Sequence, residues 1–180
     1  MSLVTLSRGQ LQTLRSQLPL FGTDNAPALA GRFCQFYGID FAERLPHVGY
    51  KVGRVDSGSY SLAVHSWVQP GATNNLFLVH GYFDHTGLFG KLAEWALLRG
   101  CNVLSVDLPG HGLSTGEPAV IDDFGDYSRA IADVLVVAAP AQRRSRVVPQ
   151  RGRGRREPRL QGGEGGIAGC RYEEGELREG

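Results

Sequence analysis

Apolar and polar positions alternate with two different periods along the first 141 residues. Apolar residues recur at helical spacing in four segments, at about 7–18, 27–37, 88–97 and 123–138, with Asp122 as the expected cap of the last. Four short runs rich in β-branched and aromatic residues predict strands, at 48–55, 60–68, 76–79 and 103–106. The order strand, helix, strand over 76–106 predicts an α/β domain in which those two strands pair in parallel.

Turn residues define how the strands connect. Asp56-Ser-Gly-Ser59 separates the first two predicted strands and indicates a hairpin. The third and fourth strands are followed by polar, glycine-bearing segments, His80–His85 and Asp107–Ser114. Because α/β proteins place their chemistry at the carboxyl ends of strands, these two segments are the candidate functional loops.

Bulk composition narrows the class of protein. The chain has 180 residues and a net charge of +1, which favours neither nucleic acid nor acidic partners. Its three cysteines have neither metal-type spacing nor a disulfide pattern, so we expect no metal and no cofactor. No run has the length of a signal peptide core or of a membrane span. These features predict a cytoplasmic protein without a membrane span.

The composition changes sharply at Gln142. Residues 142–180 contain 10 Arg, 6 Glu and 9 Gly but no Phe or Trp, and their few aliphatic residues show no period. Such a segment buries too little apolar surface to offset its ordering entropy, so we predict that it is disordered. The expected division is a helical leader at 1–47, an α/β core at 48–141 and an Arg/Gly/Glu tail at 142–180.

Two ordered motifs resemble a known family. His80-Gly-Tyr-Phe-Asp-His85 follows one strand, and Asp107-Leu-Pro-Gly-His-Gly-Leu-Ser114 follows the next. Their order and separation resemble the amino-terminal half of an α/β-hydrolase, in the lysophospholipase, monoglyceride lipase and serine aminopeptidase-like branch. The resemblance covers about residues 48–139. It implies a mostly parallel sheet with flanking helices, of which this chain carries the amino-terminal half.

The resemblance also implies roles for residues in the loops. His80, Gly81 and Tyr82 would form the oxyanion-hole loop, with the Tyr82 N–H as the first donor. Asp107 would anchor the turn that follows it, and the histidines would brace loop backbone. The motif positions are Asp84, His85, Asp107, Gly110, His111, Gly112 and Ser114. Trp95 is expected to be the part of its helix that packs in the hydrophobic core.

The expected catalytic residues are missing from the sequence. Gly112-Leu-Ser114-Thr-Gly116 has the spacing of a nucleophile motif, but Pro109 precedes it and Pro118 follows it, so it lacks the strand–turn–helix setting of a nucleophile elbow. All five histidines precede the expected position of the elbow. Nucleophile, acid and general base are therefore all absent from the predicted site.

Three hypotheses follow from these patterns. The preferred one is a truncated or frameshifted hydrolase of carboxylic esters or acyl-glycerols, inactive as given and prone to self-association through the strand at 76–79. A non-catalytic binding protein on the same half-fold is the first alternative. The second alternative is a nucleic-acid binder using Arg151–Arg156, which the six Glu and the single aromatic residue of the tail disfavour.

Overall fold

The computed structural model describes residues 5–142, with side-chain surroundings up to residue 138. Apart from Gln142, the predicted tail at 142–180 lies outside the described residues. The elements follow the order α1 (Arg8–Ser16), α2 (Ala28–Tyr37), β1 (Gly49–Ser57), β2 (Tyr60–Val68), β3 (Asn74–Val79), the 3-10 helix η1 (Thr86–Phe89), α3 (Gly90–Leu98), β4 (Cys101–Val106) and α4 (Gly125–Gln142).

The strands form one mixed sheet in the order β1-β2-β4-β3. β1 and β2 form the antiparallel hairpin that the turn at Asp56–Ser59 predicts, and β2 also pairs antiparallel with β4. β3 pairs parallel with β4, from Asn74 opposite Cys101 to Val79 opposite Val106. The parallel part of the sheet is therefore limited, in the described residues, to β3 and β4, because the hairpin reverses the direction of the strand beside β4.

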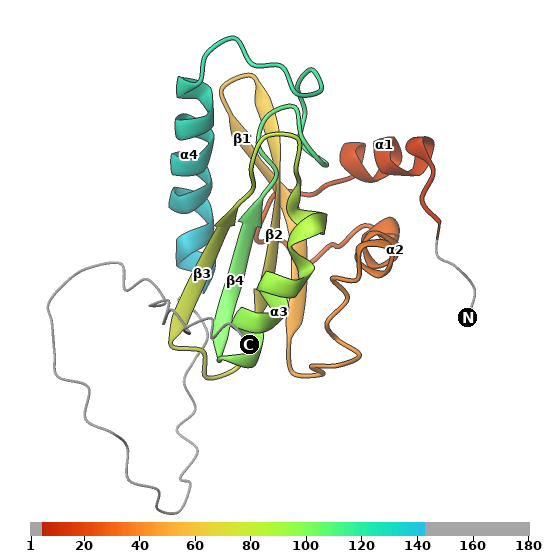
Figure 1. Cartoon of the computed structure of the whole chain (residues 1–180), viewed down its shortest axis with the longest axis vertical. Helices are drawn as coiled ribbons and strands as arrows, with labels where there is room; N and C mark the ends of the chain where they lie inside the picture. The colour runs from red at the N-terminus through yellow and green to blue at the C-terminus, as the bar shows by residue number, and fades with distance from the viewer. Residues whose placement is uncertain (1–4, 143–180) are drawn as a thin grey trace, which may run out of the picture. The chain divides into compact units, whose positions relative to one another are not determined.

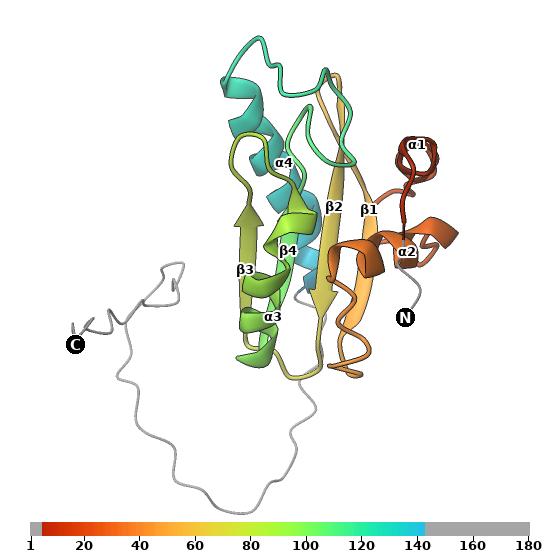
Figure 2. The same cartoon turned by 45° about the vertical axis from the view of Figure 1, so that its right-hand side comes forward.

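Helices cover both faces of this sheet (Figures 1 and 2). α4 lies against one face, and α1, α2 and α3 lie on the other. The sheet has one hydrophobic core on each face. Alternate residues of a strand contribute to the two cores, since successive side chains point to opposite faces. In β4, Val103 joins the core under α2 and α3, whereas Leu104 and Val106 join the core under α4.

The leader that the sequence analysis set apart packs directly on the sheet. Leu14 of α1 and Phe33 of α2 are buried in the same core as Trp67 of β2. The residues after α1 also cover the outer edge of β1. The Phe21 N–H donates to the Arg54 carbonyl at 2.9 Å, and the Arg54 N–H donates to the Pro19 carbonyl at 2.7 Å. The leader thus supplies both core and an edge cover.

Two local predictions were wrong. Asp123, not Asp122, caps α4, since its Oδ1 accepts the Gly125 N–H at 2.7 Å. Trp95 is 38% exposed rather than a core residue. Ala93, Ala96 and Leu97 form the buried face of α3. Trp95 lies off that face with the Arg99 guanidinium 4.1 Å from its ring centroid, a cation–π contact.

Candidate functional site

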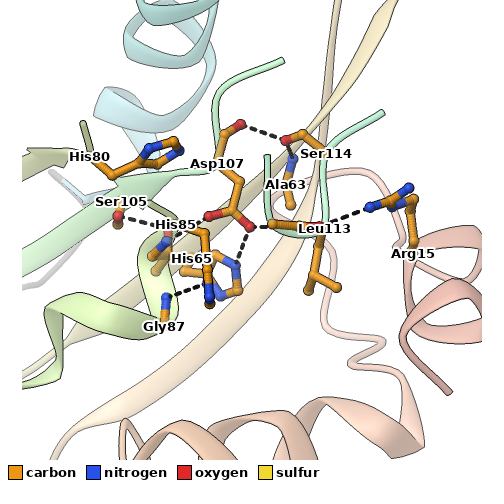
Figure 3. Close-up of polar contacts among 12 residues, drawn as sticks. Arg15, Ala63, His65, His80, His85, Gly87, Ser105, Asp107, Leu113 and Ser114 are labelled. Carbon is orange, nitrogen blue, oxygen red and sulfur yellow. Dashed lines mark hydrogen bonds and ion pairs between the residues drawn. The ribbon is translucent and has the colours of Figure 1, made fainter. Parts of the chain in front are cut away.

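One carboxylate joins the two motif loops (Figure 3). Asp107 is fully buried at the end of β4. Its Oδ1 accepts a hydrogen bond from the Thr86 N–H and its Oδ2 accepts one from the Leu113 N–H, both at 2.8 Å. Thr86 begins η1 in the segment after β3, and Leu113 lies in the segment after β4. Asp107 therefore fixes the position of one loop relative to the other.

The surroundings of Asp107 keep its carboxylate ionised. Burial by itself raises the pKa of a carboxyl group, because a low dielectric disfavours charge. The adjacent His65 ring and the N–H donors of Leu113 and Thr86 outweigh that effect and hold the pKa of Asp107 well below its usual value. His65 Nε2 lies 3.7 Å from Asp107 Oδ2, an electrostatic contact longer than a hydrogen bond.

A buried polar layer continues from His65 beneath α2. His65 Nδ1 lies 2.8 Å from the Tyr50 hydroxyl. Burial is the main reason that the pKa of Tyr50 lies well above its usual value, and burial likewise raises the pKa of Cys34 to about 12. Across the sheet His65 faces Ser105, whose hydroxyl lies 2.9 Å from that of Thr86. These polar side chains therefore lie beside the carboxyl end of β4, next to Asp107.

His80 braces the start of the loop after β3. Its Nε2 accepts the Leu108 N–H at 2.9 Å, and its Nδ1 lies 2.7 Å from the Gly81 carbonyl. Because an amide N–H only donates and a carbonyl only accepts, the ring carries its proton on Nδ1 and donates it to Gly81. His80 thus links the loops after β3 and β4 through its two nitrogens.

The turn after His80 presents a backbone donor at the carboxyl end of β3. The Asp84 N–H donates to the Gly81 carbonyl at 3.2 Å. Phe83 is 76% exposed with φ of 66°, a conformation that is uncommon for residues other than glycine and that concentrates at functional sites. Within residues 5–142 the Tyr82 N–H donates to no acceptor, while the Tyr82 hydroxyl donates to the Ala119 carbonyl.

His85 and α2 hold the far end of the same loop. His85 Nδ1 accepts the Gly87 N–H at 3.1 Å, and the His85 ring packs edge-on against Tyr37 of α2 at a centroid distance of 4.7 Å. A Cβ on Gly87 would lie 2.7 Å from the Tyr37 ring. Burial lowers the pKa of His85, although the Asp107 charge opposes this effect. The helix from the leader therefore positions the loop directly.

Ser114 has a structural role in the loop after β4. Its hydroxyl donates to the Asp107 carbonyl at 2.5 Å and accepts the Ala63 N–H at 2.8 Å, and the side chain is buried. A nucleophile must be accessible and contact a general base. Within residues 5–142, none of the hydrogen bonds made by serine side chains goes to a histidine. Ser114 thus makes structural contacts with backbone atoms of β2 and of the residue after β4.

His111 occupies a buried position between the two loops. Its Nδ1 donates to the Pro109 carbonyl at 2.8 Å, and its Nε2 makes no hydrogen bond within the described residues. The ring centroids of His80 and Tyr82 lie 5.1 and 5.5 Å away. His111 therefore packs the Gly110–Gly112 turn against the candidate oxyanion loop.

Three supporting residues were missed by the sequence analysis. Arg15 of α1 donates to the Gly112 carbonyl at 2.8 Å, Tyr37 packs on His85, and His65 faces Asp107. Of these three residues, only His65 has a signal in the sequence, because it is a histidine in a strand of otherwise apolar and small residues. Arg15 and Tyr37 act across 97 and 48 residues of chain, a separation that no local pattern reports.

Two kinds of feature are absent from the described residues. No group of three or more histidine, cysteine, aspartate or glutamate residues in this part of the chain is placed to hold a metal ion. No helix among residues 5–142 combines the length and the apolar character needed to cross a membrane.

Both candidate loops lie in a segment that matches a known protein family. Residues 71–149 match the family described as serine aminopeptidase, S33. A monoglyceride lipase homolog of Monkeypox virus is 43% identical over 61 residues, which are 34% of this chain and 22% of that protein. Protein K6 of Vaccinia virus (strain Western Reserve) is 46% identical over 50 residues, 28% of this chain and 62% of that protein. The match thus covers less than two thirds of either relative.

Solved structures show weaker similarity. A CIB-like hydrolase from Thermoplasma acidophilum is 24% identical with a TM-score of 0.43, covering 51% of this chain and 47% of that one. An epoxide hydrolase from Aspergillus niger is 15% identical with a TM-score of 0.41, covering 73% and 41%.

The family match over residues 71–149 and the two loop motifs support a partial α/β-hydrolase. Among hydrolases it is similar to monoglyceride lipase homologs.

Proposed function

We propose that this chain carries the oxyanion-hole half of a serine-dependent hydrolase that acts on carboxylic esters or acyl-glycerols. One observation carries the proposal: the Tyr82 N–H, which has no acceptor in the described residues, lies in a turn fixed by His80 and Asp107 at the carboxyl end of β3. The name of the Monkeypox virus relative supports acyl-glycerols as the substrate class.

The loop suits one part of ester hydrolysis. Attack on an ester carbonyl moves negative charge onto the carbonyl oxygen, and a fixed N–H donor stabilises that charge without reorganising during the reaction. The Tyr82 N–H is such a donor, and the link from Asp107 through Thr86 keeps the loop in place. A second donor, the nucleophile and the general base would have to come from outside residues 5–142.

We predict that the purified chain is not labelled by a fluorophosphonate probe. Such probes require a serine activated by a base beside an oxyanion hole. Ser114 is buried and bonded to backbone atoms, so it offers neither access nor a base. Mass spectrometry of the intact chain after incubation with the probe measures the outcome.

Two variants make the labelling experiment decisive. Ser114→Ala tests the buried serine, and Ser128→Ala tests an exposed serine on α4 as a matched control. Stoichiometric labelling that Ser114→Ala abolishes and Ser128→Ala leaves intact would establish Gly112–Gly116 as a working elbow, contrary to the proposal.

We further propose that the change of composition at Gln142 reflects a change of reading frame. Arg, Gly, Glu and Pro replace the apolar strand that the resemblance leads us to expect there. We predict that another frame, entered near codons 136–145, encodes a strand followed by Gly-x-Ser-x-Gly. Nucleotide sequencing of this region tests the proposal. A verified frame with no such motif in any downstream frame would contradict it.

A further inference from the structure

The two edges of the sheet differ. At the β1 edge, Pro19–Phe21 pairs with Arg54 through two backbone hydrogen bonds. At the other edge lies β3, which pairs on one side with β4 and on its other side with no strand among residues 5–142. Figure 1 shows β3 as the outermost strand. A row of backbone N–H and C=O groups is therefore open to pairing.

The sequence of β3 lacks the features that protect exposed edges. Natural edge strands carry lysine, proline or a bulge, each of which blocks further pairing. β3 reads Asn74-Asn-Leu-Phe-Leu-Val79 and contains no charge and no proline. It also pairs with β4 in unbroken register over all six residues. Among residues 5–142, the outer edge of β3 is therefore uncharged and pairs with no other strand.

Apolar surface accompanies this edge on both faces. Leu76 and Phe77 are only partly buried, and Val79 is 39% exposed. The reason is the placement of the helices: α3 packs on β4, and α4 packs on β1, β2 and β4. Pairing with a further strand would bury these side chains as well as the backbone groups.

Charge decides which strand fits the edge. Within this chain, residues 143–180 carry ten Arg and six Glu, and their longest uncharged run, Gly165–Cys170, contains one aliphatic residue besides alanine, so their composition does not match the edge. A second copy of β3 is neutral and apolar like the edge itself. We propose that β3 pairs antiparallel with β3 of a second copy, so that two sheets join into one of eight strands. Because a two-fold contact occupies the β3 edge of both copies, this assembly closes at two copies.

Strand geometry selects the register of the pair. In an antiparallel pair, two residues that lie directly opposite either both direct their N–H and C=O groups at the partner strand or both direct them away from it. When the two strands are identical, the opposite residues therefore both have odd numbers or both have even numbers. Centring the two-fold axis on Phe77 places Phe77 opposite Phe77 of the second copy. Leu76 then faces Leu78, and Asn75 faces Val79. This register keeps the apolar side chains of each face together.

Disulfide trapping tests this register in the full chain. In a Cys170→Ser background, Phe77→Cys places two thiols opposite each other at a Cα separation of about 4.5–5.5 Å, within the range of a disulfide. Asn75→Cys is the matched control, because its two copies would lie about 14 Å apart. Under a mild oxidant we expect covalent dimers from Phe77→Cys and none from Asn75→Cys.

Charge variants at exposed positions test the same interface without a covalent bond. Asn75→Lys with Val79→Lys sets two pairs of like charges directly opposite, whereas Asn75→Lys with Val79→Glu sets two pairs of opposite charges there. Sedimentation equilibrium should show a dimer for the wild-type chain. The dissociation constant should rise about tenfold or more for the double lysine variant and remain near wild type for the Lys/Glu variant.

Several outcomes would overturn the proposal. A wild-type monomer over the whole concentration range would mean that the edge is covered from within the same chain. Oligomers that continue to grow with concentration would show that the contact does not close at two copies. A dimer that tolerates the double lysine variant, or that cross-links equally at positions 75 and 77, would place the interface elsewhere. Circular dichroism establishes that each variant is folded, and the cross-linking result stands by itself if a charged variant is not.

Discussion

Replacing Asp107 by asparagine is expected to lower the free energy of unfolding by about 3 kcal/mol at neutral pH. The carboxylate accepts one N–H donor on each oxygen, from Thr86 and from Leu113. An asparagine has one oxygen and one NH₂ group, so one of the two backbone donors would face another donor. That contact breaks, and the loop it holds loses its attachment to the end of β4.

The same variant should change how stability depends on pH. The pKa of Asp107 is lower in the folded chain than the value of about 3.9 in an unfolded chain. Between the two values the unfolded state binds more protons, so the stability from Asp107 is complete above the unfolded pKa and is lost as the pH falls toward the folded one. The difference in stability between wild type and Asp107→Asn should therefore shrink as the pH is lowered.

Urea unfolding from about pH 3 to about pH 7 measures both effects. The protein concentration is held constant, because association would shift the apparent stability. Asp56→Asn is the matched control: its carboxylate is exposed and pairs with Arg54, so a change within about 0.5 kcal/mol is expected. A stability difference for Asp107→Asn that stays constant over this pH range would exclude Asp107 as the ionised anchor.

Gly112→Ala should destabilise the chain by about 4 kcal/mol, against about 1 kcal/mol for Gly100→Ala. Both glycines have positive φ, 51° and 76°. A Cβ on Gly100 would meet no atom within 4 Å, whereas a Cβ on Gly112 would overlap the Asp107 carboxylate. The comparison separates the cost of the backbone conformation, which both variants share, from displacement of the buried carboxylate, which only Gly112→Ala causes.

Urea unfolding of the two alanine variants under identical conditions measures this difference. Amide exchange of Thr86 and Leu113 gives a second readout, since both N–H groups should lose protection in Gly112→Ala and keep it in Gly100→Ala. Equal destabilisation by the two variants would show that the Gly112 turn yields without disturbing Asp107.

Local sequence was sufficient for the elements and for the loops. Among residues 5–142, the period of apolar residues predicted the four α-helices and the four strands to within a few residues, but it did not predict the 3-10 helix η1. The separation of His80–His85 from Asp107–Ser114 predicted two loops at neighbouring strand ends, because parallel strands joined by a helix bring their carboxyl ends together. The turn at Asp56–Ser59 predicted the hairpin.

Local sequence was insufficient wherever the partner of a residue lies far along the chain. Trp95 has the apolar character of a core residue, yet the buried face of α3 is set by how that helix sits on β4. The leader has no motif, yet Arg15 and Tyr37 hold the two candidate loops.

The sequence by itself indicated, through the resemblance of two motifs, a partial α/β-hydrolase with Gly81, Asp107 and Gly112 at its loops. All three residues belong to short motifs that are visible in the sequence. Only the tertiary structure decided that Asp107 joins both loops, that His65 stands beside it, and that β3 is the open edge among the described residues. Each of these depends on strand order, and strand order is set by packing between segments that no local pattern connects.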